Sequence, residues 1–162
     1  MKYNFISDRV KSIKPSQTIA VTSKARELKE LGKDVIGLGA GEPDFDTPIH
    51  IKDAAIKAIK EGKTKYTAVD GVLELKEAIC EKFLRDNQLG YDIDEISVGA
   101  GGKQVLFNAL LATIDKGDEV IIPAPYWVSY PDMVVIAEGI PVILETSKEN
   151  KFKVTLEQLN KT

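Results

Sequence analysis

One stretch decides how the chain is organised: Ile96-Ser97-Val98-Gly99-Ala100-Gly101-Gly102-Lys103-Gln104-Val105-Leu106-Phe107-Asn108. Its β-forming residues, its glycines and its helix-forming residues predict a strand, a tight turn and a helix, in that order. The start of a helix presents unpaired N–H groups and the positive end of the helix dipole, and glycine lets an anion approach the backbone closely. The stretch therefore indicates an anion site, to which Lys103 adds positive charge.

Two common phosphate motifs do not fit this stretch. A P-loop has a glycine five residues before its Gly-Lys pair and Ser or Thr after it, but Ser97 and Gln104 occupy those places. The dinucleotide fingerprint G-x-G-x-x-G starts at Gly99 and Gly101 and ends on Gln104. The residues alone leave two interpretations open: a phosphate site for a ligand other than ATP or NAD, and a surface turn before a helix.

The composition limits the class of protein. The 162 residues, 43% hydrophobic and 29% charged, are typical of one globular domain with a core. A net charge of -3 gives no indication of nucleic acid or an acidic membrane surface as partner. The single cysteine, Cys80, excludes an internal disulfide framework, and the single histidine, His50, excludes a multi-histidine metal site within the chain. Because neither an apolar leader nor a long apolar run occurs, we expect a cytoplasmic protein.

Helical and strand patterns alternate along the chain. Helices are expected over 16–31, 48–61 and 70–89, with Ser16, Thr47 and Asp70 as their N-caps. Gly32 and Gly90 are expected to end the first and the third of them. One further helix is expected from 103 onward and another that ends at 137, and strands are expected over 34–38, 96–98, 119–123 and 140–144. This alternation predicts an α/β fold with a mainly parallel sheet and flanking helices. Thr155 and Gln158 form a capping box, and the helix that they begin has under two turns before Thr162. We therefore expect the N-terminal part of a longer chain, or a truncated product.

Two loops follow predicted strands, where ligands bind in open α/β sheets. Loop 99–103 offers anion-binding amides, and loop 123–127 offers the flat indole of Trp127. A phosphate and a flat ring together match a phosphorylated aromatic cofactor. The alternative for Trp127 is an ordinary core or interface tryptophan.

Several motifs, spread over nearly the whole chain, resemble the N-terminal part of the fold-type I pyridoxal-phosphate aminotransferases. The likeness is greatest to bacterial aspartate aminotransferases of subgroup Iβ, some of which also accept prephenate. The resemblance implies an N-terminal arm and small-domain segment over 1–47 and the first part of the cofactor-binding large domain over 48–162. The motifs are Lys14-Pro15-Ser16, Gly39-Ala40-Gly41-Glu42-Pro43-Asp44-Phe45-Asp46-Thr47-Pro48, Lys63-Thr64-Lys65-Tyr66, Gly101-Gly102-Lys103-Gln104 and Pro125-Tyr126-Trp127-Val128-Ser129-Tyr130-Pro131.

The resemblance implies pyridoxal 5'-phosphate as cofactor. Gly101, Gly102 and Lys103 look like the turn whose backbone amides hold the cofactor phosphate, and Trp127 looks like the aromatic that stacks on the pyridine ring. Tyr66 resembles the tyrosine that reaches the phosphate of the partner subunit. The resemblance therefore implies a homodimer with shared active sites.

The resemblance also implies substrates. Gly41 looks like the loop glycine beside the substrate α-carboxylate, Trp127 borders the same site, and Lys103 resembles the lysine used for the distal carboxylate of a dicarboxylic substrate. The implied reaction moves an amino group between L-aspartate and 2-oxoglutarate. Prephenate is a further candidate, since Lys14 matches a position associated with its use.

The catalytic groups of the family have no counterpart in these residues. The Schiff-base lysine, the aspartate that pairs with the pyridine nitrogen and the arginine that binds the α-carboxylate are all expected beyond Thr162. We therefore assign no catalytic residue. The alternative to an N-terminal portion of a transaminase is a truncated, non-catalytic product that binds cofactor weakly or pairs with an intact subunit. A nucleotide-binding domain is a third possibility.

Overall fold

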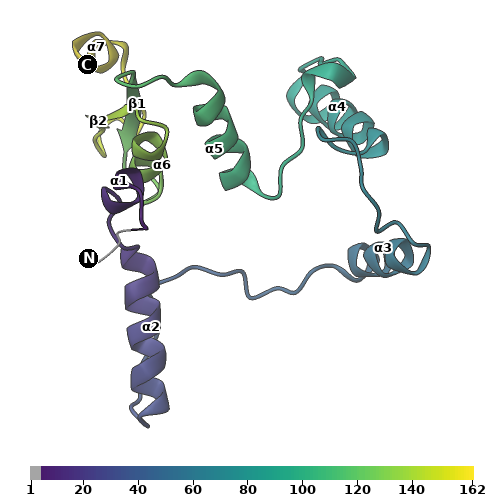
Figure 1. Cartoon of the computed structure of the whole chain (residues 1–162), viewed down its shortest axis with the longest axis horizontal. Coiled ribbons are helices and arrows are strands. Elements are labelled where there is room, and N and C mark those ends of the chain that lie inside the picture. The colour runs from purple at the N-terminus through teal and green to yellow at the C-terminus, as the bar shows by residue number, and fades with distance from the viewer. Residues whose placement is uncertain (1–4) are drawn as a thin grey trace. The chain divides into compact units, whose positions relative to one another are not determined.

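The computed structural model describes residues 5–162 (Figure 1). The described residues group into two compact units. The first unit combines the residues up to Gly41 with Leu106–Thr162, and the second unit is Glu42–Val105. In chain order the elements are α1 (Asp8–Lys11), α2 (Gln17–Glu30), α3 (Ile49–Lys60), α4 (Leu73–Asn87), the 3-10 turn η1 (Ile93–Glu95), α5 (Gly102–Thr113), β1 (Glu119–Ala124), α6 (Tyr130–Ile136), β2 (Ile140–Glu145) and α7 (Leu156–Lys161).

The first unit is built on a parallel β-α-β arrangement. Strands β1 and β2 pair in parallel from Glu119 opposite Ile140 to Ala124 opposite Glu145, and α6 connects them (Figure 1). The buried apolar side chains of this unit come from these elements and the turn that follows α6: Ile122, Val134, Ala137 and Leu144. Burying this apolar surface stabilises the unit. The α/β fold with a parallel sheet that the sequence predicts is confirmed.

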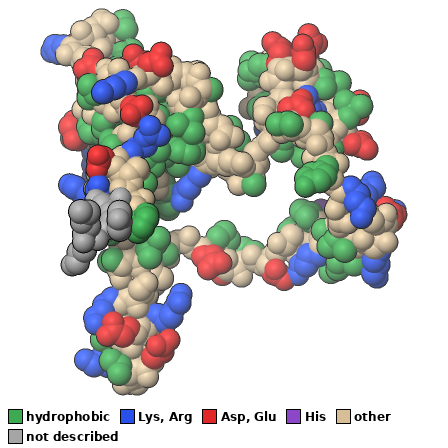
Figure 2. Space-filling model, viewed as in Figure 1, with side chains coloured by type: hydrophobic (Ala, Val, Ile, Leu, Met, Phe, Trp, Pro, Cys, Tyr) green, Lys and Arg blue, Asp and Glu red, His purple; other side chains and the backbone are tan. Residues whose placement is uncertain are grey.

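One face of β1 remains open to an apolar hollow of about 250 Å³. The hollow lies among α5, β1 and α6, and its lining is almost entirely apolar: Leu106, Leu110, Val120, Ile121, Ile122, Pro123, Tyr130, Met133 and Val134. Figure 2 shows such apolar side chains at the surface beside charged ones. The sheet face therefore has the composition of a buried layer.

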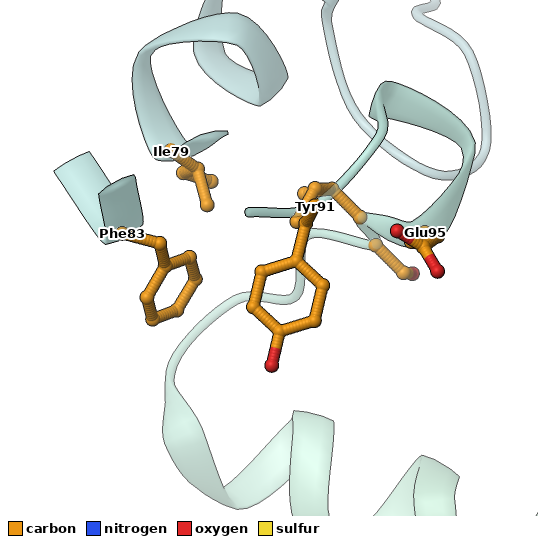
Figure 3. A pocket seen from close by; sticks show the side chains of 6 residues that line it. Ile79, Phe83, Tyr91 and Glu95 are labelled. Carbon is orange, nitrogen blue, oxygen red and sulfur yellow. The ribbon is translucent and has the colours of Figure 1, made fainter. Parts of the chain in front are cut away.

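The second unit is organised around α4. Tyr91 packs edge to face against Phe83 of α4, with ring centroids 5.6 Å apart and planes at 67° (Figure 3). The two rings border an open hollow of about 460 Å³, whose lining includes Ile79 and Glu95. Aromatic pairs of this geometry add to the free energy of burial. This contact fixes on α4 the segment that leads into the glycine stretch.

Three predicted helix ends are confirmed by their caps. The Ser16 hydroxyl accepts a hydrogen bond from the Ile19 N–H at 3.4 Å, and Gly32 follows α2 with φ of 77°. The Thr155 hydroxyl accepts from the Gln158 N–H at 3.2 Å, which completes the predicted capping box at α7.

Two helices, α3 and α4, have boundaries that differ from the prediction. The N-cap of α3 is Pro48, not Thr47, and no side chain caps it. Helix α4 begins at Leu73 rather than beside Asp70, because the Asp70 carboxylate accepts a hydrogen bond from Lys76 instead of capping. This helix ends before Gln88, whose left-handed φ of 59° stops it ahead of Gly90.

The strands predicted at 34–38 and 96–98 do not form. A strand needs a ladder partner, and within residues 5–162 the only ladder joins β1 to β2. Ile36 and Leu38 remain 83% and 90% exposed. Val98 makes one backbone bond to Asp70 in place of a ladder. The hydrophobic pattern of both segments suits strands, but the structure provides no neighbour for either.

Among the described residues, no helix combines the length and the apolar character that crossing a bilayer requires. The domain boundary expected between residues 47 and 48 remains a prediction.

Candidate functional site

The glycine turn precedes α5, as the sequence predicts. Gly101 has a left-handed φ of 91°, and Gly102 begins the 12-residue helix. A Cβ added at either residue would meet no atom within 4 Å. The turn is therefore open on the side where these two side chains would stand, so a ligand can approach the backbone there.

A side chain that sequence reasoning missed closes the turn. The Oε1 atom of Gln104 accepts a hydrogen bond from the Ala100 N–H. The Gly101 N–H donates to the Gly99 carbonyl at 2.9 Å, and the Gln104 N–H donates to the Gly101 carbonyl at 3.1 Å. These bonds hold the turn in one shape before any ligand binds. The signal was the four-residue spacing between Ala100 and Gln104.

The turn has the chemistry of a phosphate site. The open backbone at Gly101 and Gly102 stands at the positive end of the α5 dipole, and Lys103 adds a cation in the first turn. These residues fit the phosphate of pyridoxal 5'-phosphate.

A second loop supports the turn from within the same unit. The Asp70 carbonyl accepts a hydrogen bond from the Val98 N–H at 2.9 Å, and the Asp70 carboxylate accepts another from the Lys76 ammonium. The hydrogen bond from Lys76 holds the pKa of Asp70 below its usual value. Sequence reasoning missed this contact because it assigned Asp70 to a helix cap.

Trp127 lies in the first unit, between β1 and α6. Its side chain is half exposed, and its carbonyl accepts a hydrogen bond from the Tyr130 N–H at 3.0 Å. The loop follows Ala124 at the end of β1, where the Thr146 hydroxyl donates to the Ala124 carbonyl. The indole is therefore accessible beyond the carboxyl end of β1, in the loop that the sequence predicts to follow this strand.

The other predicted site residues are exposed. Tyr66 lies in the second unit between α3 and α4, with its side chain fully exposed. Gly41 and Lys14 belong to the first unit, with Lys14 exposed between α1 and α2. The structure thus brings Gly101, Gly102 and Lys103 together in one turn and places the others at separate points along the chain. The roles assigned to all of them remain predictions.

Comparison with known proteins places this geometry in context. The family model described as aminotransferase class I and II matches residues 33–162. The aspartate/prephenate aminotransferase of Cereibacter sphaeroides is 66% identical over 96% of this chain, and that of Nitrosomonas europaea is 65% identical over the same share. The chain spans 39% of the length of each of these relatives.

Solved structures show the same fold. The aspartate aminotransferase of Rhizobium meliloti superposes with a TM-score of 0.92 at 52% identity, over 98% of this chain and 40% of that one. The Thermus thermophilus enzyme, solved with maleate, gives 0.92 at 50% identity, over 98% of this chain and 42% of that one. The chain corresponds to an N-terminal portion of these proteins, and it belongs to the class I and II aminotransferase family.

Proposed function

We propose that the protein containing this chain is a pyridoxal-phosphate-dependent aminotransferase that moves an amino group between L-aspartate and 2-oxoglutarate. The observation that carries the proposal is the open glycine turn at the start of α5, with Lys103 in its first helical turn. Two relatives with about two thirds of their aligned residues identical are named aspartate/prephenate aminotransferase, which supports the same substrate class.

The cofactor would be held by the glycine turn and by one aromatic side chain. The Gly102 amide and the positive charge of Lys103 would bind its phosphate over the open backbone of Gly101, whose own N–H donates to the Gly99 carbonyl. The half-exposed indole of Trp127 would stack on its ring. The bound cofactor supplies an electron sink for charge that develops at the substrate α-carbon. Tyr66, whose side chain is fully exposed, is the residue that we assign to the cofactor phosphate of a partner subunit in a homodimer.

The substrate would be oriented by two carboxylate contacts. Gly41 lies in open backbone suited to the α-carboxylate, and the Lys103 ammonium would pair with the distal carboxylate. The maleate in the Thermus thermophilus structure is a dicarboxylate, which supports a dicarboxylic substrate. Lys14, exposed between two helices, is the residue that we assign to prephenate as a second substrate.

The decisive experiment compares two amino donors with the protein as its gene encodes it. Lys103→Ala should lower kcat/KM for aspartate by about 10- to 100-fold, the value of a hydrogen bond to a charged group, and affect phenylalanine less. Lys116→Ala, at an exposed lysine beyond the other end of α5, is the matched control and should change neither. An equal loss for both donors would refute the distal-carboxylate role.

The same assay addresses the alternative, a truncated product without catalysis. Wild-type protein that shows no transamination of any amino acid, together with a reading frame that stops after Thr162, would support that alternative. Turnover of aspartate by a longer gene product would exclude it.

A further inference from the structure

Lys76 is the only charged residue that is buried in the part of the chain that the structure describes. It lies in α4, and 5% of its surface is exposed. Its ammonium donates a hydrogen bond to the Asp70 carboxylate, which is half exposed. Burying an ammonium group costs free energy unless a partner of opposite charge accepts its hydrogen bonds. The Asp70 carboxylate offsets that cost, so the ion pair constrains how the Asp70 loop lies against α4.

The partner of Lys76 is joined directly to the segment that enters the glycine turn. The Asp70 carbonyl accepts the Val98 N–H at 2.9 Å. At Gly71, with φ of 117°, a Cβ would stand 2.7 Å from the Val98 Cγ2 atom and 3.8 Å from the Lys76 Cγ atom. The loop, the lysine stem and Val98 therefore meet at one point.

The segment that contains Val98 and Gly99 is also closely packed on its other side, against α5. A Cβ at Gly99 would stand 2.8 Å from the Val105 Cγ2 atom of α5. Val98 and Gly99 are thus held between the Asp70 loop and the start of α5. The Asp70 loop is therefore hydrogen-bonded to the backbone that begins the turn and lies against it.

We infer that Lys76 is a positioning residue for the cofactor phosphate, acting through Asp70 and Val98 on the turn Gly99–Lys103. The inference rests on the proposed function. Amides bind an anion well only when they are fixed in place beforehand, because ordering them on binding consumes part of the affinity. Lys76 fixes the position of the Asp70 loop through its hydrogen bond to the Asp70 carboxylate, and it contacts neither the phosphate nor the substrate.

The test separates the phosphate from the rest of the cofactor. The apo form of the gene product is titrated with pyridoxal phosphate and with pyridoxal, which lacks the phosphate, and the two dissociation constants are compared. Lys76→Met should raise the dissociation constant of pyridoxal phosphate about tenfold, as is common when a residue that supports a ligand-binding group is lost. The dissociation constant of pyridoxal should change little. Lys76→Arg should restore the wild-type ratio, because it keeps the charge and the reach.

Two further variants keep the result interpretable. Lys57→Met removes an exposed lysine paired with Glu61 on α3 and should leave both dissociation constants unchanged. If Lys76→Met does not fold, as judged by circular dichroism, Asp70→Asn provides the test, since it keeps the side-chain shape and the backbone carbonyl. It should shift the same ratio in the same direction.

The outcomes are distinct. If a folded Lys76 or Asp70 variant raises both dissociation constants by the same factor, or raises neither, the inference is overturned. The proposed function is unaffected by that result. Wild-type protein that binds neither ligand would overturn the proposed function, and the inference with it.

Discussion

Replacing Gly71 with alanine introduces two separate costs at the loop beneath the glycine turn. The backbone φ of 117° lies where L-residues rarely stand, and such strain costs roughly 1 to 3 kcal/mol. The new Cβ would also lie 2.7 Å from the Val98 Cγ2 atom and 3.0 Å from its Cβ atom. Overpacking of this kind costs about 1 to 3 kcal/mol. We expect Gly71→Ala to lower the free energy of unfolding by about 2 to 6 kcal/mol.

A matched glycine separates the strain from the clash. Gly62 has φ of 75°, but a Cβ there would meet no atom within 4 Å. Gly62→Ala should therefore cost only the left-handed strain, about 1 to 2 kcal/mol. The excess cost at Gly71 then measures contact with Val98. Adding Val98→Ala to Gly71→Ala should recover part of that excess, so the two substitutions should couple.

The assay combines a global and a local measurement. Equilibrium urea unfolding, followed by far-ultraviolet circular dichroism, gives the free energies of the single and double variants. Hydrogen exchange at the Val98 amide, which donates to the Asp70 carbonyl at 2.9 Å, reports opening of this contact itself. Equal destabilisation by the two glycine variants, with unchanged protection of Val98, would refute the reasoning.

Three further perturbations test the account. Val134→Ala, at a side chain 1% exposed, removes two methyl groups and should destabilise the first unit by about 2 to 3 kcal/mol in urea unfolding. Thr155→Ala removes the acceptor of the Gln158 N–H and should cost about 1 kcal/mol, visible as faster hydrogen exchange in α7. Because Lys76 lowers the pKa of folded Asp70 below its usual 3.8, that pair stabilises the fold above this value and stops doing so as the pH falls through the folded pKa. Asp70→Asn should therefore flatten the acid limb of the unfolding curve, and an unchanged acid limb would contradict the pairing.

Local signals made much of the fold predictable. The apolar runs at 119–123 and 140–144 identified both strands, and the Ser16 and Thr155 hydroxyls identified helix starts. These features depend on residues within one turn or one strand of each other. A cap or an apolar run carries its own signal, so sequence reasoning recovers it.

Features that depend on how loops fold against other elements were not predictable. The strand expected at 96–98 needs a neighbouring strand, but its backbone N–H groups donate to Ile93 in the preceding turn and to Asp70, 28 residues from Val98 in sequence numbering. The burial of Lys76 follows from how the Asp70 loop folds over α4, which no local pattern encodes. The glycine turn was predicted from its residues, but the loop that supports it was not.

The most direct measurement of the central claim is the intact mass of the gene product after borohydride reduction. Borohydride fixes a lysine-bound pyridoxal phosphate as a stable pyridoxyl adduct, and peptide mapping then locates the lysine. The account predicts one adduct per chain, on a lysine outside residues 1–162. Absence of any adduct, or an adduct on a lysine within these residues, would contradict it.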